Sequence, residues 1–304
     1  MYELIIIGGG PAGMTAAVYA ARKKLNALLL SRDIGGQVLW TSGIENYMGY
    51  QFIEGSELMQ KFEEQVKQFP IDMNTGERVS TLSQINGGFE AKTDKGKSYQ
   101  GSAVIIATGK RPRQLNVPGE EKLRGRGVTY CAICDGPLFA SENVAVTGGG
   151  NSALEAAEDM IKIAKHVYLV SLTPLTGDQI LIDKVKDANN LTMFLEYEVL
   201  EIKGESRVEG IKVRDLKSKQ ERELDVSGIF IEIGLIPNSE PFKGIVHLNR
   251  LGEIEVNYAN ETGVPGLFAA GDVTNVPEKQ IVVAAGEGAK AALQAHRYLQ
   301  RLSE

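Results

Sequence analysis

Short, unbroken runs of apolar residues recur along the chain, and glycine-rich turns follow several of them. Aliphatic runs of this length are typical of strands in a parallel sheet that is covered on both faces. The runs predicted as buried strands are residues 3–7, 27–30, 103–109, 143–147, 167–170 and 264–272. The pattern therefore predicts an α/β fold built around parallel strands.

Helical periodicity accompanies these strands, and the predicted helices are residues 14–23, 57–69, 154–164 and 281–299. Residues 77–99 alternate between polar and apolar positions around two glycine-containing turns, which predicts an antiparallel meander. Residues 192–233 predict further strands with charged hairpins. Proline-containing segments at 110–113 and 237–241 predict two hinges.

The first strand, turn and helix form a dinucleotide-binding fingerprint, Gly8-Gly9-Gly10-Pro11-Ala12-Gly13. In the G-x-G-x-x-G pattern, Gly8 permits the tight turn, Gly10 lets a pyrophosphate approach the backbone, and Gly13 lets helix and strand pack closely. The helix N-terminus that follows offers amide donors and a favourable field for phosphate. This segment predicts a dinucleotide site.

A second fingerprint, Gly148-Gly149-Gly150-Asn151-Ser152-Ala153, follows the strand 143–147. It is G-x-G-x-x-A, with alanine at the position where helix and strand pack. About 20 residues further on, where a ribose-binding residue belongs, the chain has Ser171-Leu172-Thr173-Pro174. This segment holds neither the acid that selects NAD nor an arginine for the NADP phosphate. We therefore expect an intact pyrophosphate turn without the usual ribose contact.

Several polar residues outside the fingerprints are candidates for binding a ligand. The strand 27–30 is followed by Ser31-Arg32-Asp33, so the usual ribose-binding acid is either displaced to Asp33 or missing. A glycine-rich loop with Gly36, Gln37 and Asn46 comes next. A loop this long within a compact domain usually carries a ligand. Asp272 stands at the carboxyl end of a predicted strand, the edge at which ligands gather in open α/β sheets.

Composition and charge exclude several classes of protein. The chain has 304 residues, enough for two domains, and its 43% hydrophobic and 24% charged content is ordinary for a globular protein. A formal charge of -6 argues against a nucleic-acid-binding protein. No run has the length of a membrane span, and residues 1–7 lack the features of a signal peptide. A single Cys-x-x-Cys pair suits a reducing cytosol, so we expect a cytoplasmic protein.

The only two cysteines, Cys131 and Cys134, are separated by two residues, and Asp135 follows directly. Gly136-Pro137 disfavours a long helix here, so the pair is predicted on a short turn. Half a zinc site and two inert buried thiols are alternatives to a redox-active disulfide. A zinc site at the two cysteines would need further ligands, and the three histidines stand far away in the sequence. Two nucleotide folds around a dithiol instead favour electron transfer through a flavin, which accepts hydride and reduces disulfides.

These motifs carry a family resemblance. In chain order they are Gly8 to Gly13, Gly35-Gly36-Gln37, Ala107-Thr108-Gly109, Cys131-Ala132-Ile133-Cys134-Asp135-Gly136, Gly148 to Ser152 and Ala269-Ala270-Gly271-Asp272. Over essentially its whole length the chain resembles the low-molecular-weight thioredoxin reductase family. Residues 127–131, 134–139 and 279–290 are most similar to the flavin-bearing part of the alkyl hydroperoxide reductase flavoprotein subunit. That subunit has an additional N-terminal thioredoxin-like region, whereas this chain starts at the first FAD strand.

The resemblance implies two Rossmann-like three-layer domains, the second inserted in the first. Residues 1–114 and 242–304 would form a discontinuous FAD-binding domain, and residues 115–241 an NAD(P)-binding-like domain that carries the cysteines. The family's inserted domain swings so that either nicotinamide or dithiol faces the flavin. A homodimer is also implied.

The resemblance further implies residue roles. FAD contacts are expected from Gly8, Gly10, Pro11, Ala12, Gly13, Asp33, Gly36, Gln37, Asn46, Thr108, Gly109, Gly271, Asp272, Lys279, Gln280 and Ile281. Nicotinamide dinucleotide contacts are expected from Gly148, Gly150, Asn151 and Ser152. Cys134 resembles the thiol that faces the flavin, Cys131 the thiol that attacks the partner, and Asp135 the general acid. No metal site is expected.

The leading hypothesis is a disulfide reductase that uses NADH in preference to NADPH and reduces a separate thioredoxin- or glutaredoxin-like protein. A first alternative is the same reductase fed by reduced ferredoxin or another flavoprotein, because the ribose-binding residue is missing. A second is a non-catalytic flavin-bound redox sensor or assembly module.

Overall fold

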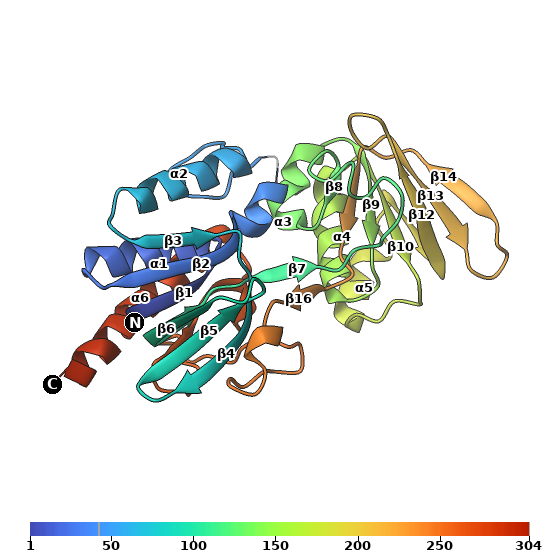
Figure 1. Ribbon diagram of the computed structural model, residues 1–304. Coiled ribbons are helices and arrows are strands. Elements are labelled where there is room, and N and C mark those ends of the chain that lie inside the picture. Colours follow the sequence, from blue (N-terminus) through green and yellow to red (C-terminus); the bar gives the residue numbers. More distant parts are fainter. Residues whose placement is uncertain (42, 304) are drawn as a thin grey trace.

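The computed structural model describes residues 1–41 and 43–303 and consists of two α/β lobes (Figure 1). The first lobe contains both chain termini and a seven-stranded sheet in the order β3-β2-β1-β6-β5-β4, with β17 beside β6. Its strands are β1 (Tyr2–Gly9), β2 (Ala27–Ile34), β3 (Asp72–Thr75), β4 (Val79–Ile85), β5 (Gly88–Thr93), β6 (Ser98–Ile106) and β17 (Leu267–Ala269). The aliphatic run of β1 is paired in parallel with β2 on one side and β6 on the other. Its side chains are therefore buried on both faces of the sheet.

Helices cover one face of this sheet. They are α1 (Pro11–Arg22), α2 (Gly55–Lys67) and α6 (Ile281–Ser303). The small residues of α6 allow it to lie directly on α1, since a Cβ at Gly288 would come within 2.0 Å of the Ala12 carbonyl oxygen. On the opposite face, apolar side chains such as Phe89 and Phe242 complete a second core. The lobe thus has three layers.

The sequence predicted a meander over residues 77–99 and a separate buried strand over residues 103–109, and this separation was wrong. The third strand of the meander and the run 103–109 are a single strand, β6, and residues 107–109 lie beyond its end. Its first half is paired antiparallel with β5, and its second half is paired in parallel with β1 and β17. The polar-to-apolar change along β6 marks its passage from the edge of the sheet into the core, not a break between strands.

The second lobe is built around a five-stranded sheet in the order β11-β10-β9-β15-β8. Its strands are β8 (Val128–Thr129), β9 (Asn143–Thr147), β10 (His166–Ser171), β11 (Leu191–Leu195) and β15 (Gly228–Ile231). Helices α3 (Ala132–Asp135), α4 (Asn151–Ile163) and α5 (Gln179–Val185) lie on one side, and the antiparallel strands β12 (Tyr197–Lys203), β13 (Gly210–Asp215) and β14 (Glu221–Leu224) cover the other. The fold class is confirmed: two Rossmann-like three-layer units, the second inserted in the first.

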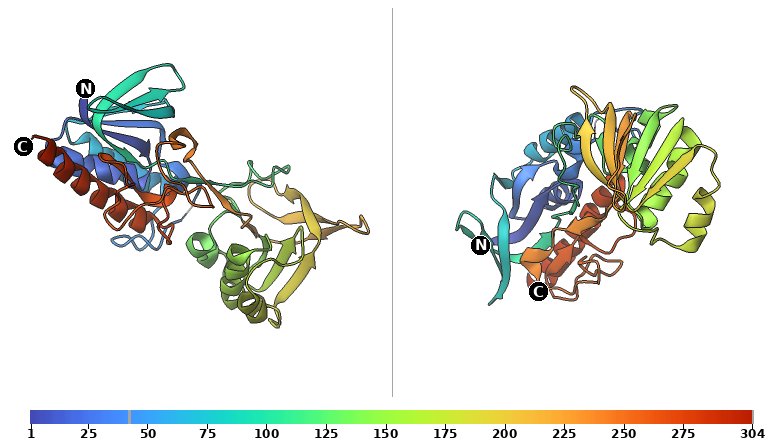
Figure 2. Two further views of the ribbon diagram at one scale, coloured as in Figure 1. Left: turned by 90° about the horizontal axis from the view of Figure 1, so that it is seen from below. Right: turned by 90° about the vertical axis from the view of Figure 1, so that its right-hand side faces the viewer.

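A narrow two-stranded connection joins the lobes, as Figure 2 shows. The chain enters the second lobe through β7 (Lys110–Pro112) and returns through β16 (Leu235–Pro237), and these two strands are paired antiparallel. Both predicted hinges therefore begin within one ribbon, rather than in two independent loops. The remaining short elements are the 3₁₀ turns η1 (Gly36–Trp40), η2 (Gly136–Phe139), η3 (Glu240–Phe242) and η4 (Gly271–Val273). Among the described helices, none combines the length and the apolar character needed to cross a bilayer.

Candidate functional site

Cys131 and Cys134 form a disulfide at the start of α3, with their Cα atoms 5.3 Å apart. Cys131 is the N-cap residue of this helix, and its sulfur accepts a hydrogen bond of 3.2 Å from the Cys134 amide. The helix has four residues because Gly136 and Pro137 turn the chain into η2. The pair therefore lies on a short turn, and it has the disulfide form expected of the redox interpretation.

Asp135 directly follows Cys134 and is buried. Thr129 connects this carboxyl to the pair, because its hydroxyl donates a hydrogen bond to Asp135 and accepts one of 3.2 Å from the Cys131 amide. Within the described part of the chain, the Asp135 Oδ1 atom has no hydrogen-bond partner. Burial raises the pKa of Asp135 to about 6, against the opposing hydrogen bond from Thr129. Asp135 can therefore exchange a proton in the neutral range, next to a disulfide.

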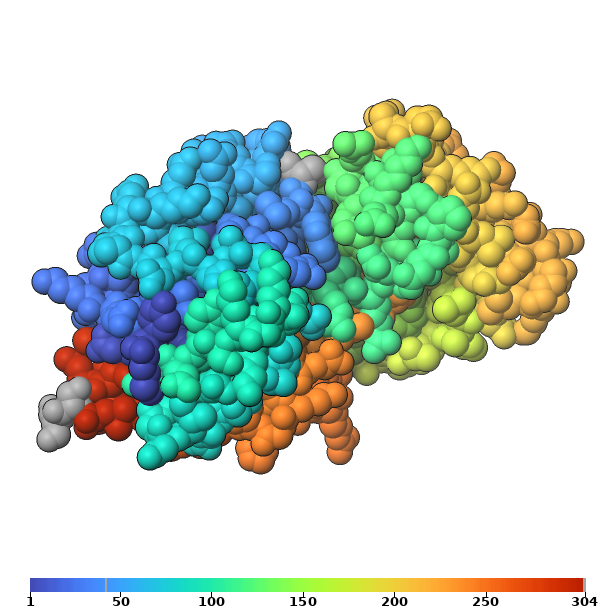
Figure 3. Space-filling view, viewed as in Figure 1, coloured from blue at the N-terminus to red at the C-terminus, as the bar shows by residue number. Residues whose placement is uncertain are grey.

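A cavity of about 660 Å³ lies between the lobes, and both lobes line it. Figure 3 shows the outer surfaces of the two lobes meeting, where light-blue residues touch green ones. The predicted site residues that line the cavity are Gly8, Gly10, Pro11, Ala12, Asp33, Gly36, Gln37, Thr108, Gly109, Cys131, Cys134, Asp135, Ser152, Asp272, Lys279, Gln280 and Ile281. The volume is within the range of small-molecule and cofactor sites. The fold thus brings the first fingerprint and the disulfide to one cavity.

The glycines of the first fingerprint fit a dinucleotide. A Cβ at Gly8 would lie 2.2 Å from the Ala107 carbonyl oxygen, and one at Gly13 would lie 1.8 Å from the Gly8 carbonyl oxygen. Both positions therefore require glycine for close backbone packing. Gly10 differs, because a Cβ there would meet no atom within 4 Å and would occupy open space at the cavity. An open backbone at the N-terminus of α1 is the arrangement that a pyrophosphate needs, so the residues present fit FAD.

Some predicted residues do not line the cavity. They are Gly13, Asn46, Gly148, Gly150, Asn151 and Gly271. Gly13 and Gly271 instead allow close packing, since a Cβ at Gly271 would lie 3.0 Å from the Ala12 Cβ. Asn46 reaches the site indirectly, through a hydrogen bond of 3.3 Å from its amide to Gln280 Oε1. Of the second fingerprint, only Ser152 faces the cavity.

The segment after Ser171 covers part of the second fingerprint turn. The Thr176 and Gly177 amides donate hydrogen bonds of 2.7 and 3.1 Å to the Gly149 carbonyl. Asn151 and Asp178 exchange two hydrogen bonds, of 2.8 and 3.0 Å. Gly150 remains open, because no atom lies within 4 Å of a Cβ built there. The turn therefore keeps an exposed backbone, with a carboxylate rather than a cation beside it.

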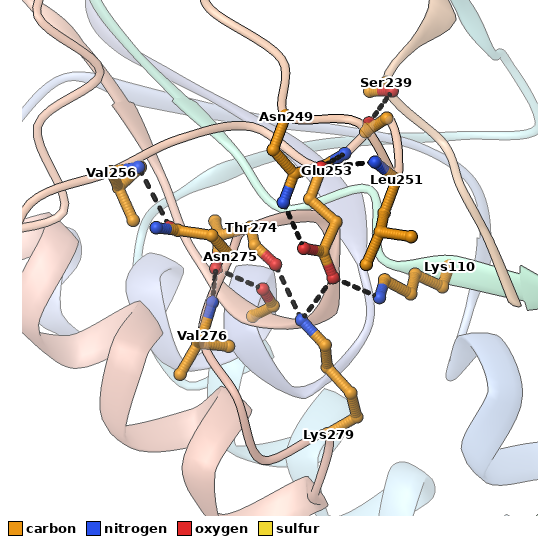
Figure 4. A network of polar contacts seen from close by, with 12 residues as sticks. Lys110, Ser239, Asn249, Leu251, Glu253, Val256, Thr274, Asn275, Val276 and Lys279 are labelled. Atoms are coloured by element: carbon orange, nitrogen blue, oxygen red, sulfur yellow. Dashed lines mark hydrogen bonds and ion pairs between the residues drawn. The ribbon is translucent and has the colours of Figure 1, made fainter. Parts of the chain in front are cut away.

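Figure 4 shows a buried charged network, two lysines of which, Lys110 and Lys279, line the cavity. Glu253 accepts hydrogen bonds from Lys110 and Asn249 and forms an ion pair of 3.1 Å with Lys279. Burial opposes ionisation of Glu253, but the bonds from these three residues hold its pKa below the usual range. Burial raises the pKa of the neighbouring Asp272 carboxyl, and the charges of Lys279 and Lys110 oppose this effect. The network holds two lysines at the cavity wall.

We predict that Glu253→Gln destabilises the folded protein by about 3 kcal/mol, because it leaves two partly or wholly buried ammonium groups without their carboxylate. The side chains of Lys110 and Glu253 are only 7% and 9% exposed. The matched control is Glu205→Gln, which breaks an exposed pair with Lys122 and should cost less than about 1 kcal/mol. Urea unfolding of the two variants measures the difference, and equal midpoints would contradict the prediction.

Sequence reasoning missed Trp40 and Glu232, which line the cavity, and Glu253, which pairs with Lys110 and Lys279 at the cavity wall. Glu253 lies in a segment with no motif, and Trp40 was not singled out although it is the only tryptophan. Glu232 follows β15 and lines the cavity. Burial raises the pKa of Glu232 to about 7, despite a hydrogen bond from the Ala132 amide. An acid directly after a buried strand was the available sequence signal for Glu232.

Known proteins resemble the chain over nearly its full length. An alkyl hydroperoxide reductase subunit of Escherichia coli is 43% identical over 305 residues, which cover 99% of this chain and 58% of that protein. The chain thus spans less than two thirds of the curated relatives that it matches. Thioredoxin reductase from Streptococcus pyogenes is 36% identical, covers 99% of both chains and superposes with a TM-score of 0.94.

A second thioredoxin reductase superposes less well on the chain. Thioredoxin reductase from Lactococcus lactis, in its FR conformation, is 34% identical and is covered over its full length, but its TM-score is 0.69. The pyridine nucleotide-disulphide oxidoreductase family model matches residues 2–288. The match includes both fingerprints and the disulfide. The chain therefore belongs to the pyridine nucleotide-disulphide oxidoreductase family.

Proposed function

We propose that this chain is an FAD-dependent protein-disulfide reductase. It would carry electrons from a reduced nicotinamide to a thioredoxin- or glutaredoxin-like protein by way of the Cys131–Cys134 pair. The observation that carries this proposal is that the first dinucleotide fingerprint and the disulfide line the same cavity. The thioredoxin reductases among the similar structures support it.

FAD would supply a two-electron carrier between the nicotinamide and the disulfide. The backbone at Gly8 and Gly10 and the N-terminus of α1 would hold its pyrophosphate. The residues proposed to surround the rest of the cofactor are Pro11, Ala12, Asp33, Gly36, Gln37, Asn46, Thr108, Gly109, Asp272, Lys279, Gln280 and Ile281. Asp33 forms an exposed ion pair with its neighbour Arg32 through its Oδ2 atom.

Cys134 is proposed to face the flavin and Cys131 to attack the partner. When the Cys131–Cys134 bond takes up two electrons, the sulfur–sulfur bond breaks and two thiols form after two protons are bound. Asp135 is proposed to donate one of these protons, because it directly follows Cys134, is linked to the Cys131 amide through Thr129, and has a pKa that burial raises to about 6. The Cys131 thiolate then attacks the partner's disulfide, which forms a mixed disulfide and releases one partner thiolate. Attack of Cys134 on Cys131 re-forms the Cys131–Cys134 bond and releases the second partner thiol, so that both electrons pass to the partner.

The second fingerprint is the proposed nicotinamide dinucleotide site, with Gly148, Gly150, Asn151 and Ser152 at its turn. Ser171 is buried at the end of β10, and the segment after it contains Asp178 but no arginine up to that residue. A carboxylate near the turn disfavours the additional phosphate of NADPH. We therefore propose NADH as the preferred donor.

Stopped-flow reduction of the FAD-loaded protein tests the donor. With equal concentrations of each nucleotide and no oxygen, NADH should bleach the flavin absorbance at least about tenfold faster than NADPH, the effect of one unfavourable contact of about 1.4 kcal/mol. Thioredoxin reduction driven by NADH is the accompanying assay. Equal or faster bleaching by NADPH would contradict the preference.

One observation favours a second candidate donor. Polar groups of the second fingerprint turn are already hydrogen-bonded within the chain: the Gly149 carbonyl accepts from Thr176 and Gly177, and the Asn151 side chain donates to Asp178. If these contacts block the nucleotide, electrons would come from reduced ferredoxin or another flavoprotein. Absence of bleaching by both nucleotides, followed by turnover when reduced ferredoxin is added, would support this alternative. A homodimer, and a division into residues 1–114 with 242–304 and residues 115–241, also remain proposals.

A further inference from the structure

Trp40, the chain's only tryptophan, belongs to the first lobe but contacts the second. It is the last residue of the turn η1, which begins with Gly36 and Gln37. The Arg124 guanidinium lies over its ring, 4.9 Å from the centroid, and the Tyr130 ring lies 6.2 Å away. The side chain thus bridges the two lobes next to the cavity that it lines.

The backbone of the second lobe also lies close to Trp40. A Cβ at Gly125 would lie 3.2 Å from the Trp40 carbonyl oxygen, and Gly125 has a φ of +69°. Among the described residues, the Arg124 Nε atom is buried without a hydrogen-bond acceptor. Packing against an aromatic face is the interaction that remains for this part of the guanidinium.

Tyr130 connects Trp40 to the disulfide, because it contacts the Trp40 ring and immediately precedes Cys131. Its hydroxyl donates a hydrogen bond of 2.8 Å to the buried carboxylate of Glu120. Glu120 also accepts hydrogen bonds from the Leu115 and Asn116 amides, at the entry to the second lobe. The segment from Leu115 to Cys131 is therefore held as one unit, and Trp40 contacts it in the middle.

The proposed reaction requires this contact to break. In the structure the disulfide faces the cavity, whereas Gly148, Gly150 and Asn151 of the second fingerprint do not. A nicotinamide held on that turn reaches the cavity only if the second lobe rotates. The paired strands β7 and β16 are the two chain crossings between the lobes, and a narrow ribbon permits rotation. The lower superposition on the Lactococcus lactis enzyme, at similar sequence identity, supports a second arrangement of the lobes.

We infer that Trp40 is a positioning residue that holds the second lobe, through Arg124 and Tyr130, in the orientation that places the disulfide at the cavity. This inference rests on the proposed function and adds to it. Weakening the contact shifts the population toward the orientation that admits the nicotinamide. A contact of this kind is expected to bias the two orientations about fivefold, which corresponds to about 1 kcal/mol.

The single tryptophan makes the test direct. In the FAD-loaded protein, Arg124→Ala should increase the quenching of Trp40 fluorescence by acrylamide, because the ring loses its cover. The matched control is Arg126→Ala, which removes the same charge from an exposed side chain two residues away. Equal quenching in the two variants would overturn the inference. This measurement needs no electron donor, so it remains decisive even if the proposed donor is wrong.

Stopped-flow kinetics provide the second readout. Arg124→Ala should speed the reduction of FAD by the donor about fivefold, without speeding the later transfer to the disulfide. General destabilisation would slow both steps, so an unchanged or slower donor step also overturns the inference. Arg124→Lys keeps the charge without the planar face and should give a smaller acceleration. If Arg124→Ala does not bind FAD, Arg124→Lys and Trp40→Phe decide the result by the same measurements of the donor step.

Discussion

Thioredoxin reduction should fall by at least about a thousandfold in the Cys134→Ser variant, a loss typical of removing a nucleophile or an obligatory redox group. With one sulfur the protein cannot store the electron pair as a dithiol, because two thiols must form when the disulfide is opened. Bleaching of the flavin by the nicotinamide should remain measurable, since Cys134 is not part of the proposed nucleotide site. Single-turnover absorbance and steady-state turnover separate the two effects.

The companion variant distinguishes the two sulfurs. Cys131 is the proposed attacking thiol, so Cys134→Ser should trap a mixed disulfide between Cys131 and the partner, whereas Cys131→Ser should trap none. Mass spectrometry of the trapped species under non-reducing conditions makes the measurement. Undiminished thioredoxin reduction by Cys134→Ser would instead favour a non-catalytic flavin-bound sensor or assembly module. The buried Asp135 argues against that class, because a passive module has no need of a proton donor next to its disulfide.

Asp135→Asn should slow reduction of the disulfide by about a hundredfold or more, within the range for loss of a general acid. The amide keeps the shape of the carboxyl but cannot supply a proton. In the unaltered protein, the acid form of Asp135 becomes scarce above its pKa of about 6. The rate of this step should therefore fall as the pH rises from 6 to 8, and the Asp135→Asn variant should lose this dependence. A retained pH dependence with unchanged rate would exclude Asp135 as the acid.

The same substitution should raise stability at neutral pH. Burial raises the pKa of Asp135 from 3.8 to about 6, so the folded protein binds this proton more tightly than the unfolded chain does. The stability that depends on this group is complete below pH 3.8 and is lost as the pH rises through about 6. Asp135→Asn removes that loss, worth up to about 3 kcal/mol. Thermal unfolding should show a higher midpoint for the variant at pH 7.5 and no such advantage at pH 3.5.

The tertiary structure assembled residues that share no sequence pattern. Glu253 meets Lys110 and Lys279 only because the start of β7, the segment after η3 and the residues just before α6 converge beside the cavity. The contact of Trp40 with Arg124 also depends on the tertiary structure, because the two residues belong to different lobes. Local periodicity also misplaced one boundary, because β6 changes from an exposed to a buried environment without a break in the strand. Long-range pairing decides such cases, and a local window does not contain it.

The sequence by itself determined the parallel strands, the glycines of both fingerprints and the Cys-x-x-Cys turn. Each of these depends on neighbours within a few residues: unbroken aliphatic runs require burial, and a tight turn before a helix requires glycine. Only the tertiary structure decided that Cys131 and Cys134 face the first fingerprint while most of the second fingerprint turns away from the cavity. That choice depends on how two lobes rotate about β7 and β16, and a weak contact such as that of Trp40 with Arg124 is sufficient to bias it.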